Sequence, residues 1–289
     1  MRWVLVLTAP ATRGLSLSDI AAIARNLRQS AEPRWLGAAA AEIACDEHPV
    51  LGALRAAYPG IDINAVPAQQ RRKRILIADM DSTVIPVECI DEIADFAGVK
   101  AQVADITERA MAGELDFEGA LGARLELVKG LPGSALAQVF AERISLNPGA
   151  RVLVRTMAAN GAHTALVSGG FTYFTERIAA AAGFAEHRAN RLLFENGSLS
   201  GKVAEPILGR AAKLQALTEI AANLGIGPDM ALAVGDGAND ISMVEAAGLG
   251  VAYYAKPALE GKANAVIRHS DLTALLHLQG YSEDEFHQD

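Results

Sequence analysis

The sequence predicts an α/β protein: a doubly wound parallel sheet with a helical insert, preceded by a small α+β domain. Three observations support this prediction. From residue 74 onward, short apolar runs alternate with helical segments, the pattern of parallel strands joined by crossover helices. Residues 86–147 lack strand signals and are expected to form a helical cap over the sheet. Residues 1–70 instead give the order β-α-β-β-α-β, which predicts a ferredoxin-like sandwich.

The first domain, residues 1–70, is expected to begin with the apolar strand Trp3–Thr8, followed by a helix that Ser16 and its neighbours cap. The element order resembles ACT-type regulatory domains, whose ligand loop usually carries Pro-Gly after the first strand. Here that loop reads Arg13-Gly14-Leu15, so we expect dimerisation or stabilisation rather than amino-acid binding. The remaining elements expected here are strands within Trp35–Ala44, a helix over His48–Tyr58 and a strand over Ile61–Val66.

A polar, charged linker, Pro67–Lys73, leads to the second domain, which is expected to span residues 71–289. Asn196-Gly197 between two apolar runs predicts a β-hairpin. The helices expected in the cap are 89–96, 100–111, 117–127 and 134–143. After the cap, strands are expected at 163–167, 230–234, 249–253 and 265–267, with helices at 150–159, 171–182, 211–224 and 241–247.

Composition excludes several classes of protein. The 289 residues are 51% hydrophobic, enough for two domains with a sizeable core. Lys and Arg number 26 against 34 Asp and Glu, a net charge of −8 that offers no footprint for nucleic acid. No apolar stretch approaches the roughly 18 residues of a membrane span, and the run Trp3–Leu7 is short for a signal peptide. Cys45 and Cys89 have no zinc-binding spacing, which fits a cytoplasmic location.

The apolar run Ile75–Ala78 predicts a central strand that is buried on both faces and ends in two acids, Asp79 and Asp81. Chemistry in open α/β sheets occurs just beyond the carboxyl ends of the strands. One carboxylate there can act as a nucleophile, and a second, two residues on, as an acid and base. The same residues offer oxygens to Mg²⁺. The alternative is a turn whose Ser and Thr only cap a helix.

Ser168-Gly169-Gly170 follows an apolar strand and precedes a helix, so its backbone N–H groups are placed to approach an anion. The hydroxyl of Ser168 would add a donor. Lys213, on a later helix, is a candidate cation for phosphate oxygens. Each signal alone also fits an ordinary turn or a solvated lysine.

Asp236, Asn239 and Asp240 follow another apolar strand, around a tight glycine turn. The two carboxylates are expected to converge on a cation near the end of the first strand. A donor set of oxygens without His or Cys favours Mg²⁺ over zinc.

The order Asp-x-Asp-Ser-Thr, strand-Ser-Gly, Lys and Gly-Asp-Gly-x-Asn-Asp resembles the haloacid dehalogenase (HAD) superfamily, over about residues 74–270. Longer strings are similar to the phosphoserine phosphatases of that superfamily. Met80, between the two acids Asp79 and Asp81, stands where many relatives have Phe. We expect this difference to matter little, because the family uses the backbone of that residue rather than its side chain. The strings are Val-Glu88-Cys-Ile-Asp-Glu-Ile-Ala, Met-Ala-Gly-Glu-Leu-Asp-Phe117-Glu, Val-Ser168-Gly-Gly-Phe, Ala-Asn190-Arg-Leu and Val-Gly-Asp236-Gly-Ala-Asn-Asp240-Ile-Ser-Met.

The resemblance implies a role for each matching residue. Asp79 would be the nucleophile that becomes a phospho-aspartate. Asp81 would protonate the serine oxygen and then activate water, and its carbonyl would bind Mg²⁺. The resemblance further implies Asp79 and Asp236 as Mg²⁺ ligands, Asn239 and Asp240 as their supports, and Ser168, Gly169 and Lys213 as the phosphate clamp.

The same resemblance places substrate contacts in the cap, at Glu88, Phe117 and Arg124. Phe117 and Arg124 are seven residues apart on one expected helix, hence on one face. Arg suits a carboxylate and Glu an ammonium, so together they describe the head of an amino acid. The alternative is that Phe117 is core, Arg124 a surface ion pair and Glu88 part of a solvated acidic face.

These observations predict a Mg²⁺-dependent phosphatase that hydrolyses O-phospho-L-serine to L-serine. One alternative is a related phosphotransferase that uses an alcohol acceptor such as homoserine. Another is a non-catalytic amino-acid sensor, for which a nucleophile would be unnecessary. No nucleic-acid or membrane partner is expected, and pairing of the first domain's sheet edge would give a homodimer.

Overall fold

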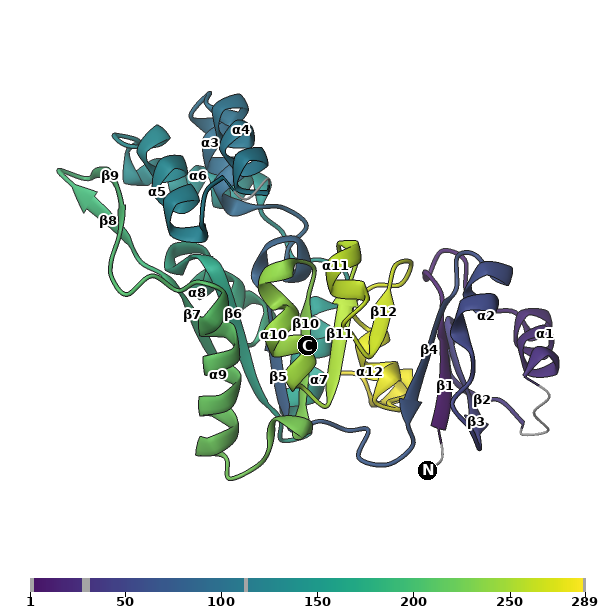
Figure 1. The fold of residues 1–289 in the computed structure, drawn as a ribbon. Coiled ribbons are helices and arrows are strands. Elements are labelled where there is room, and N and C mark those ends of the chain that lie inside the picture. The colour runs from purple at the N-terminus through teal and green to yellow at the C-terminus, as the bar shows by residue number, and fades with distance from the viewer. Residues whose placement is uncertain (1–2, 28–31, 112–113, 288–289) are drawn as a thin grey trace.

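The computed structural model describes residues 3–27, 32–111 and 114–287, and these form three parts (Figure 1). A central sheet with helices on both faces lies between the helical cap and the N-terminal domain. The described helices are too short or too polar to cross a membrane.

The N-terminal domain has the predicted ferredoxin-like order of strands and helices. Its antiparallel sheet runs β2-β3-β1-β4, and Ser16 with Asp19 forms a capping box at α1. The helix expected over His48–Tyr58 begins only at Leu51, because Pro49 disfavours helical backbone in the residue before it. The elements are β1 (Trp3–Thr8), α1 (Leu17–Asn26), β2 (Arg34–Gly37), β3 (Ala40–Cys45), α2 (Leu51–Ala57) and β4 (Asp62–Pro67).

The central sheet is parallel throughout, in the order β12-β11-β10-β5-β6-β7. Its strands are β5 (Ile75–Ala78), β6 (His163–Phe171), β7 (Glu186–Asn190), β10 (Ala231–Gly235), β11 (Leu249–Tyr253) and β12 (Ala265–Ile267). Its helices are α7 (Ala150–Ala159), α8 (Thr172–Ala182), α9 (Arg210–Asn223), α10 (Ile241–Ala246), α11 (Pro257–Glu260) and α12 (Ala274–Leu278).

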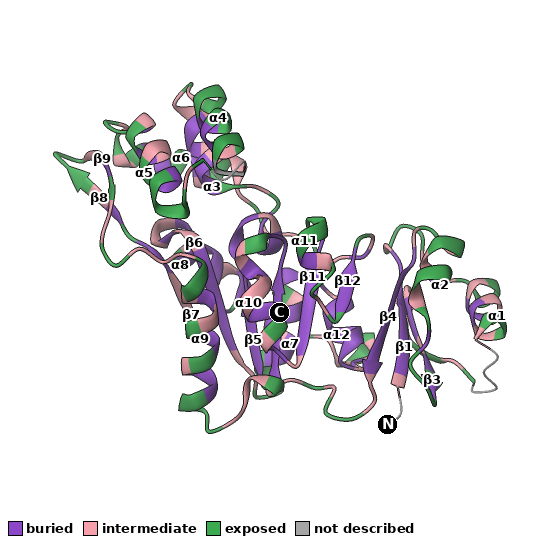
Figure 2. Ribbon diagram, in the orientation of Figure 1, coloured by how far each residue is buried: buried purple, intermediate pink, exposed green. Residues whose placement is uncertain are grey.

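Strand β5 is buried along its whole length, as its unbroken apolar run predicts (Figure 2). Ile75 and Ile77 pack in the same core cluster as residues of α9 and α10. Leu76 and Ala78 belong to the cluster that contains α7, α8 and α12. Two layers of helices therefore hold β5 fixed, and with it the acids that follow.

The cap consists of α3 (Cys89–Phe96), α4 (Lys100–Met111), α5 (Phe117–Leu127) and α6 (Gly133–Arg143). The predicted hairpin forms at Asn196-Gly197 from β8 (Leu192–Glu195) and β9 (Ser198–Val203). The sequence did not predict that this hairpin reaches the cap. Gly130 N–H donates to the carbonyl of Leu199 at 2.8 Å, and Leu199 N–H to that of Leu131 at 2.8 Å.

The N-terminal domain is fixed to the central domain by a buried polar junction. The Asp62 carboxylate, on β4, accepts the backbone N–H groups of residues 268, 269 and 270 at 2.8–3.1 Å. The Asn64 side chain both accepts from and donates to the backbone of Val266, at 2.9 and 3.0 Å. The linker is docked as well, since Arg71 donates to the carbonyls of His277 and Leu278.

Candidate active site

The candidate site lies where β5, β10 and β6 end side by side. Asp79 N–H donates to the carbonyl of Val234 on β10, which places the first acid at the carboxyl end of the central strand β5. Its Oδ1 accepts from Met80 N–H at 2.8 Å and pairs with Lys213 Nζ at 2.7 Å. No described residue donates to Oδ2 of Asp79, so that oxygen remains available for chemistry.

The turn after β5 directs the second acid back toward the first. Asp81 is extended, and Ser82 takes the left-handed conformation with φ 55°, which is unusual for a residue other than glycine. The Asp81 carboxylate accepts from Cys89 N–H at 2.8 Å through Oδ1 and from the Ser168 hydroxyl at 3.1 Å through Oδ2. The turn, the base of the cap and the end of β6 together therefore fix its position.

Lys213 projects from α9 into the site and is only 2% exposed. Its ammonium contacts Asp79 Oδ1 and also Asp240 Oδ1, the latter at 2.6 Å. Asp240 Oδ2 accepts the backbone N–H groups of Asp236 and Gly237. Since both its oxygens are engaged, Asp240 supports Lys213 and the Asp236 loop rather than offering a free ligand atom.

Carboxylate oxygens of Asp79, Asp236 and Asp240 lie within 4.8 Å of one another, and those of Asp79 and Asp236 are the candidate metal ligands. These donors are all carboxylates, which suit a hard cation such as Mg²⁺. The four acids Asp79, Asp81, Asp236 and Asp240 lie near two ammonium groups, those of Lys213 and Lys256, so the site has an excess of negative charge. A dianionic phosphate would be repelled unless a cation offset that excess, and the donor set therefore fits a divalent metal.

The pKa values reflect this crowding of charge. Burial raises the pKa of Asp81 to about 6, and the nearby Glu88 carboxylate adds to the rise. Burial raises the pKa of Asp236 to about 6 as well, together with repulsion from Asp240. Burial also raises the pKa of Asp79, while the ammonium of Lys213 opposes that rise. Burial alone would lower the pKa of Lys213, but Asp79 and Asp240 more than reverse this and keep it charged.

Ser168, Gly169 and Gly170 form the far wall of the site, at the end of β6. Gly170 N–H donates to Ser168 Oγ at 2.8 Å, which orients that hydroxyl toward Asp81. A Cβ on Gly170 would lie 2.8 Å from Asp81 Oδ2, so only glycine fits there. The buried Asn190 donates to the carbonyl of Gly169 and so holds this segment. Asn190 belongs to one of the strings shared with the phosphoserine phosphatases, but the sequence alone indicates no role for it.

Glu88 and Arg124, two of the cap residues expected to bind substrate, lie close to each other. Glu88 accepts from the Ser82 hydroxyl at 2.7 Å, which ties the cap to the turn after β5. Burial lowers the pKa of the Arg124 guanidinium, while Asp91 and Glu88 raise it, so these acids lie close to it. The alternative above places Asp91 with Glu88 on a solvated acidic face, whereas in the structure Asp91 is only partly exposed. Ala112 and Gly113, within the Phe117 string, lie outside the described residues.

Phe117 is 37% exposed and reaches from the cap to the central domain. A Cβ built on Gly169 or on Gly209 would lie 3.3 Å from its ring. The cap is therefore in contact with the wall of the site in this structure. Phe117 is not part of the core, contrary to the alternative considered above.

Asn239 lies in the loop that follows Asp236, close to Gly237. Its Oδ1 lies over Gly237, where a Cβ would approach within 2.5 Å. No hydrogen bond joins it to another residue in the described part of the chain. Its support of the metal loop therefore remains a prediction.

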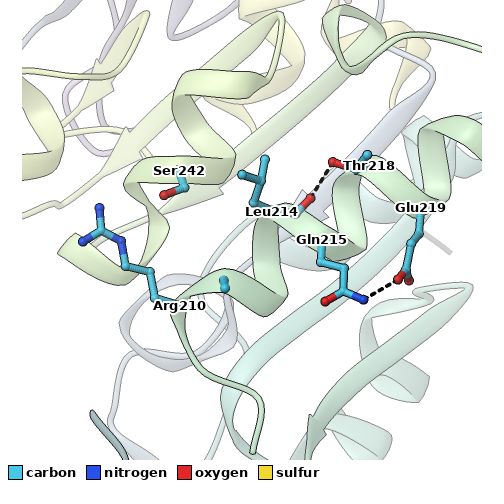
Figure 3. A pocket seen from close by; sticks show the side chains of 7 residues that line it. Arg210, Leu214, Gln215, Thr218, Glu219 and Ser242 are labelled. Carbon is cyan, nitrogen blue, oxygen red and sulfur yellow. Dashed lines mark hydrogen bonds between the residues drawn. The ribbon is translucent and has the colours of Figure 1, made fainter. Parts of the chain in front are cut away.

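A hollow of about 630 Å³ lies on the outer side of α9, away from these residues (Figure 3). Arg210, Leu214 and Ser242 are among the residues that line it. Thr218 donates to the carbonyl of Leu214, and Gln215 donates to Glu219, so its polar groups are largely paired with each other. None of the predicted site residues lines this hollow.

Comparison with known protein families shows which family the chain belongs to. Residues 76–245, more than half of the chain, match the model of the haloacid dehalogenase-like hydrolases. The chain belongs to this family. The match includes the turn after β5, the cap, Ser168, Lys213 and Asp236.

Within the family, the chain is similar to proteins named phosphoserine phosphatase. It is 44% identical over 227 residues to one from Albidiferax ferrireducens, covering 76% of this chain and 96% of that one. It is 44% identical over 218 residues to one from Archaeoglobus fulgidus, covering 75% of this chain and 63% of that one. The chain thus spans nearly all of the first relative and just under two thirds of the second.

Solved structures in the family show the same arrangement. The crystal structure of a probable phosphoserine phosphatase from Vibrio cholerae superposes with a TM-score of 0.78 at 31% identity, covering 96% of this chain and 86% of that one. A phospho-aspartyl intermediate analogue of phosphoserine phosphatase superposes with a TM-score of 0.66 at 40% identity, covering 71% of this chain and 98% of that one.

Proposed function

We propose that the protein is a phosphatase that hydrolyses O-phospho-L-serine to L-serine and phosphate, the last step of L-serine biosynthesis. The observation that supports this most is the pair of buried acids after β5. Lys213 holds one oxygen of Asp79 and leaves the other available, and Cys89 N–H and Ser168 hold Asp81 beside it. The names of the similar proteins, and the phospho-aspartyl analogue among them, support the same chemistry.

In the first half of the proposed reaction, Asp79 Oδ2 attacks phosphorus, and the bond from phosphorus to the serine oxygen breaks. Serine alkoxide is a poor leaving group, so a proton must reach it as it departs. Asp81 supplies that proton, since its raised pKa of about 6 keeps part of it protonated near neutral pH. Lys213 and the Ser168 segment stabilise the charge on the phosphoryl oxygens.

In the second half, water attacks phosphorus in the phospho-aspartate and releases phosphate and free Asp79. Asp81 is now ionised and takes a proton from that water. Its fixed hydrogen bonds keep it in the same place for both steps. One residue thus acts first as an acid and then as a base.

Asp79, Asp236 and the carbonyl of Asp81 would hold Mg²⁺, with Asp240 orienting the loop. When bound, the metal supplies positive charge that offsets the repulsion between phosphate and the carboxylates. Chelation is expected to abolish activity and Mg²⁺ to restore it. Ca²⁺ is expected to fail, because its looser coordination would misplace Asp79. Full activity in excess chelator would contradict this assignment.

Glu88, Arg124 and Phe117 would recognise the serine part of the substrate. We assign the carboxylate to Arg124, the ammonium to Glu88 and the contact that closes the cap to Phe117. The decisive experiment is a phosphate-release panel of phosphoserine, phosphothreonine and sugar phosphates, with homoserine present in a parallel set. The proposal requires phosphoserine to be the best substrate and free phosphate the product. Transfer to homoserine, or a clear preference for sugar phosphates, would refute it.

Two further properties remain predictions. A cytoplasmic location can be checked by fractionation, and a homodimer by solution mass.

A further inference from the structure

A cavity of about 530 Å³ lies where the N-terminal domain, the central domain and both linkers of the cap meet. We call it the junction pocket. The lining residues that matter here are Thr12, Pro86, Pro148, Tyr253, Tyr254 and Asp271. Thr12 comes from the loop after β1, and Pro86 and Pro148 from the segments before and after the cap. The catalytic mechanism uses none of these residues.

One side of the pocket is rigid. The hydrogen bonds from residues 268–270 to Asp62 fix the segment that leads to Asp271. Tyr254 N–H donates to the carbonyl of Ile267 at 2.8 Å, and its backbone is held in the left-handed region with φ 45°. That conformation is costly for a large residue and persists only where the surroundings impose it. It keeps the Tyr254 ring, which is 54% exposed, edge-on to the ring of Tyr253 with centroids 4.9 Å apart.

The pocket has a negative electrostatic character. Burial raises the pKa of both Tyr253 and Tyr254, and the carboxylates of Asp62 and Asp271 raise it further. Asp271 Oδ1 accepts from the backbone and hydroxyl of Thr273, whereas no described residue donates to Oδ2. The described lining contains one imidazole, His269, and no lysine or arginine. Two tyrosine rings beside a carboxylate suit an organic cation, through cation–π attraction and charge pairing.

The other side of the pocket belongs to the hinge of the cap. Asn147 N–H donates to the carbonyl of Val84 at 2.8 Å, and the Asn147 side chain donates to that of Thr83 at 2.7 Å, so the two linkers are joined at their base. Ser82, which also lines the pocket, holds Glu88 of the cap. In this structure Phe117 contacts the wall of the site, so the pocket exists while the cap is closed.

We propose that the junction pocket is a regulatory site for a small amine with an apolar body, and that its occupation holds the cap closed. The apolar body would lie against Pro86 and Pro148, and the ammonium between the tyrosine rings and Asp271. Because such a ligand contacts both linkers in their closed arrangement, it favours that arrangement over the open one. The effect on turnover rests on the function proposed above, whereas the binding does not.

Binding is tested with full-length protein by calorimetry, using n-butylamine, n-butanol and butyrate as three probes of similar shape. The amine is expected to bind, and the neutral and anionic probes to bind at least about fivefold more weakly. Asp271→Asn keeps the acceptor for Thr273 and removes the charge, so it should weaken the amine by about fivefold without unfolding the protein. Equal binding of all three probes, or an amine affinity unchanged in Asp271→Asn, would overturn the proposal.

The link to the cap is tested by hydrogen exchange and by phosphoserine kinetics. n-Butylamine at a concentration that half-saturates wild type should slow exchange in residues 85–88 and 144–149, and should slow it clearly less in Asp271→Asn. With phosphoserine, the amine should lower kcat and KM together, because a closed cap retains both substrate and product. A rise in KM alone would place the amine at Glu88 in the catalytic site and refute the regulatory site. If phosphoserine is not turned over at all, the proposed function fails while the binding and exchange results still decide this proposal.

Discussion

Two buried carboxylates at strand ends, Asp79 in the catalytic site and Asp62 in the domain junction, have opposite surroundings. Both are 4% exposed. Three backbone N–H groups occupy both oxygens of Asp62. Asp79 has only Oδ1 occupied, by Met80 N–H and Lys213, and its Oδ2 has no donor among the described residues. The fully satisfied carboxylate of Asp62 therefore stabilises the junction, whereas Asp79 keeps one oxygen available to react.

The largest effect is expected from Asp79→Asn, which removes the nucleophile but keeps the shape. Turnover of phosphoserine should fall by at least roughly 10⁴-fold, as for other enzymes that lose a nucleophile. Circular dichroism should show an unchanged fold, because the amide oxygen can still face Met80 N–H. Near-normal phosphate release from this variant would mean that Asp79 does not form the covalent intermediate.

Asp81→Asn should be next, with a loss of about 10²–10⁴-fold on phosphoserine, the usual contribution of a general acid or base. An aryl phosphate has a leaving group that needs no proton. The variant should therefore release about one equivalent of phenol quickly and then stall, because water is no longer activated. A variant that slows the first release as much with the aryl ester as with phosphoserine would argue against the acid role.

Arg124→Ala tests the substrate side of the site. Phosphoserine kcat/KM should fall by the equivalent of about 2–3 kcal/mol, as for a lost charge-assisted hydrogen bond, while an aryl phosphate loses much less. Arg143→Ala is the matched control, since Arg143 pairs with Glu92 and Asp95 elsewhere in the cap. Equal losses on both substrates would show that Arg124 is structural or contacts the phosphate.

Asp62→Ala should have the smallest effect on chemistry. The free energy of unfolding should fall by roughly 2 kcal/mol, because the three N–H groups lose their acceptor. Phosphoserine kcat per folded molecule should stay at the wild-type value. A variant that is fully stable but poorly active would show that the junction positions catalytic residues, and the contrast with Asp79 would fail.

The sequence predicted that the strand ends bring the side chains of the site together, and it did not predict the junction. Asp79, Ser168 and Asp236 each follow an apolar run that predicts a strand. Because the carboxyl ends of parallel strands lie on the same side of a sheet, the sequence predicts that these side chains lie close together. Asp62 and its partners at 268–270 are some 200 positions apart and have no pattern that links them. The sequence predicts a linker between two domains, but it does not predict that the two domains pack together.

Two other differences have local physical causes. The hairpin at Asn196-Gly197 was predicted from its turn, but its contact with Leu131 depends on how the cap folds back. Pro49 indicates that His48 is not helical, and α2 does begin later, at Leu51. The prediction of a helix over His48–Tyr58 followed the apolar pattern instead. Turns and strand ends can be predicted from neighbouring residues in the sequence, whereas docking between distant surfaces cannot.

The most direct test of the central claim is to trap the intermediate. Wild-type protein is mixed with phosphoserine carrying a labelled phosphoryl group, quenched in acid within milliseconds and digested for mass spectrometry. The account predicts one phosphoryl group on Asp79, none on the peptide that contains Asp62, and none anywhere in Asp79→Asn. Rapid turnover without any labelled Asp79, or label on a different residue, would contradict it.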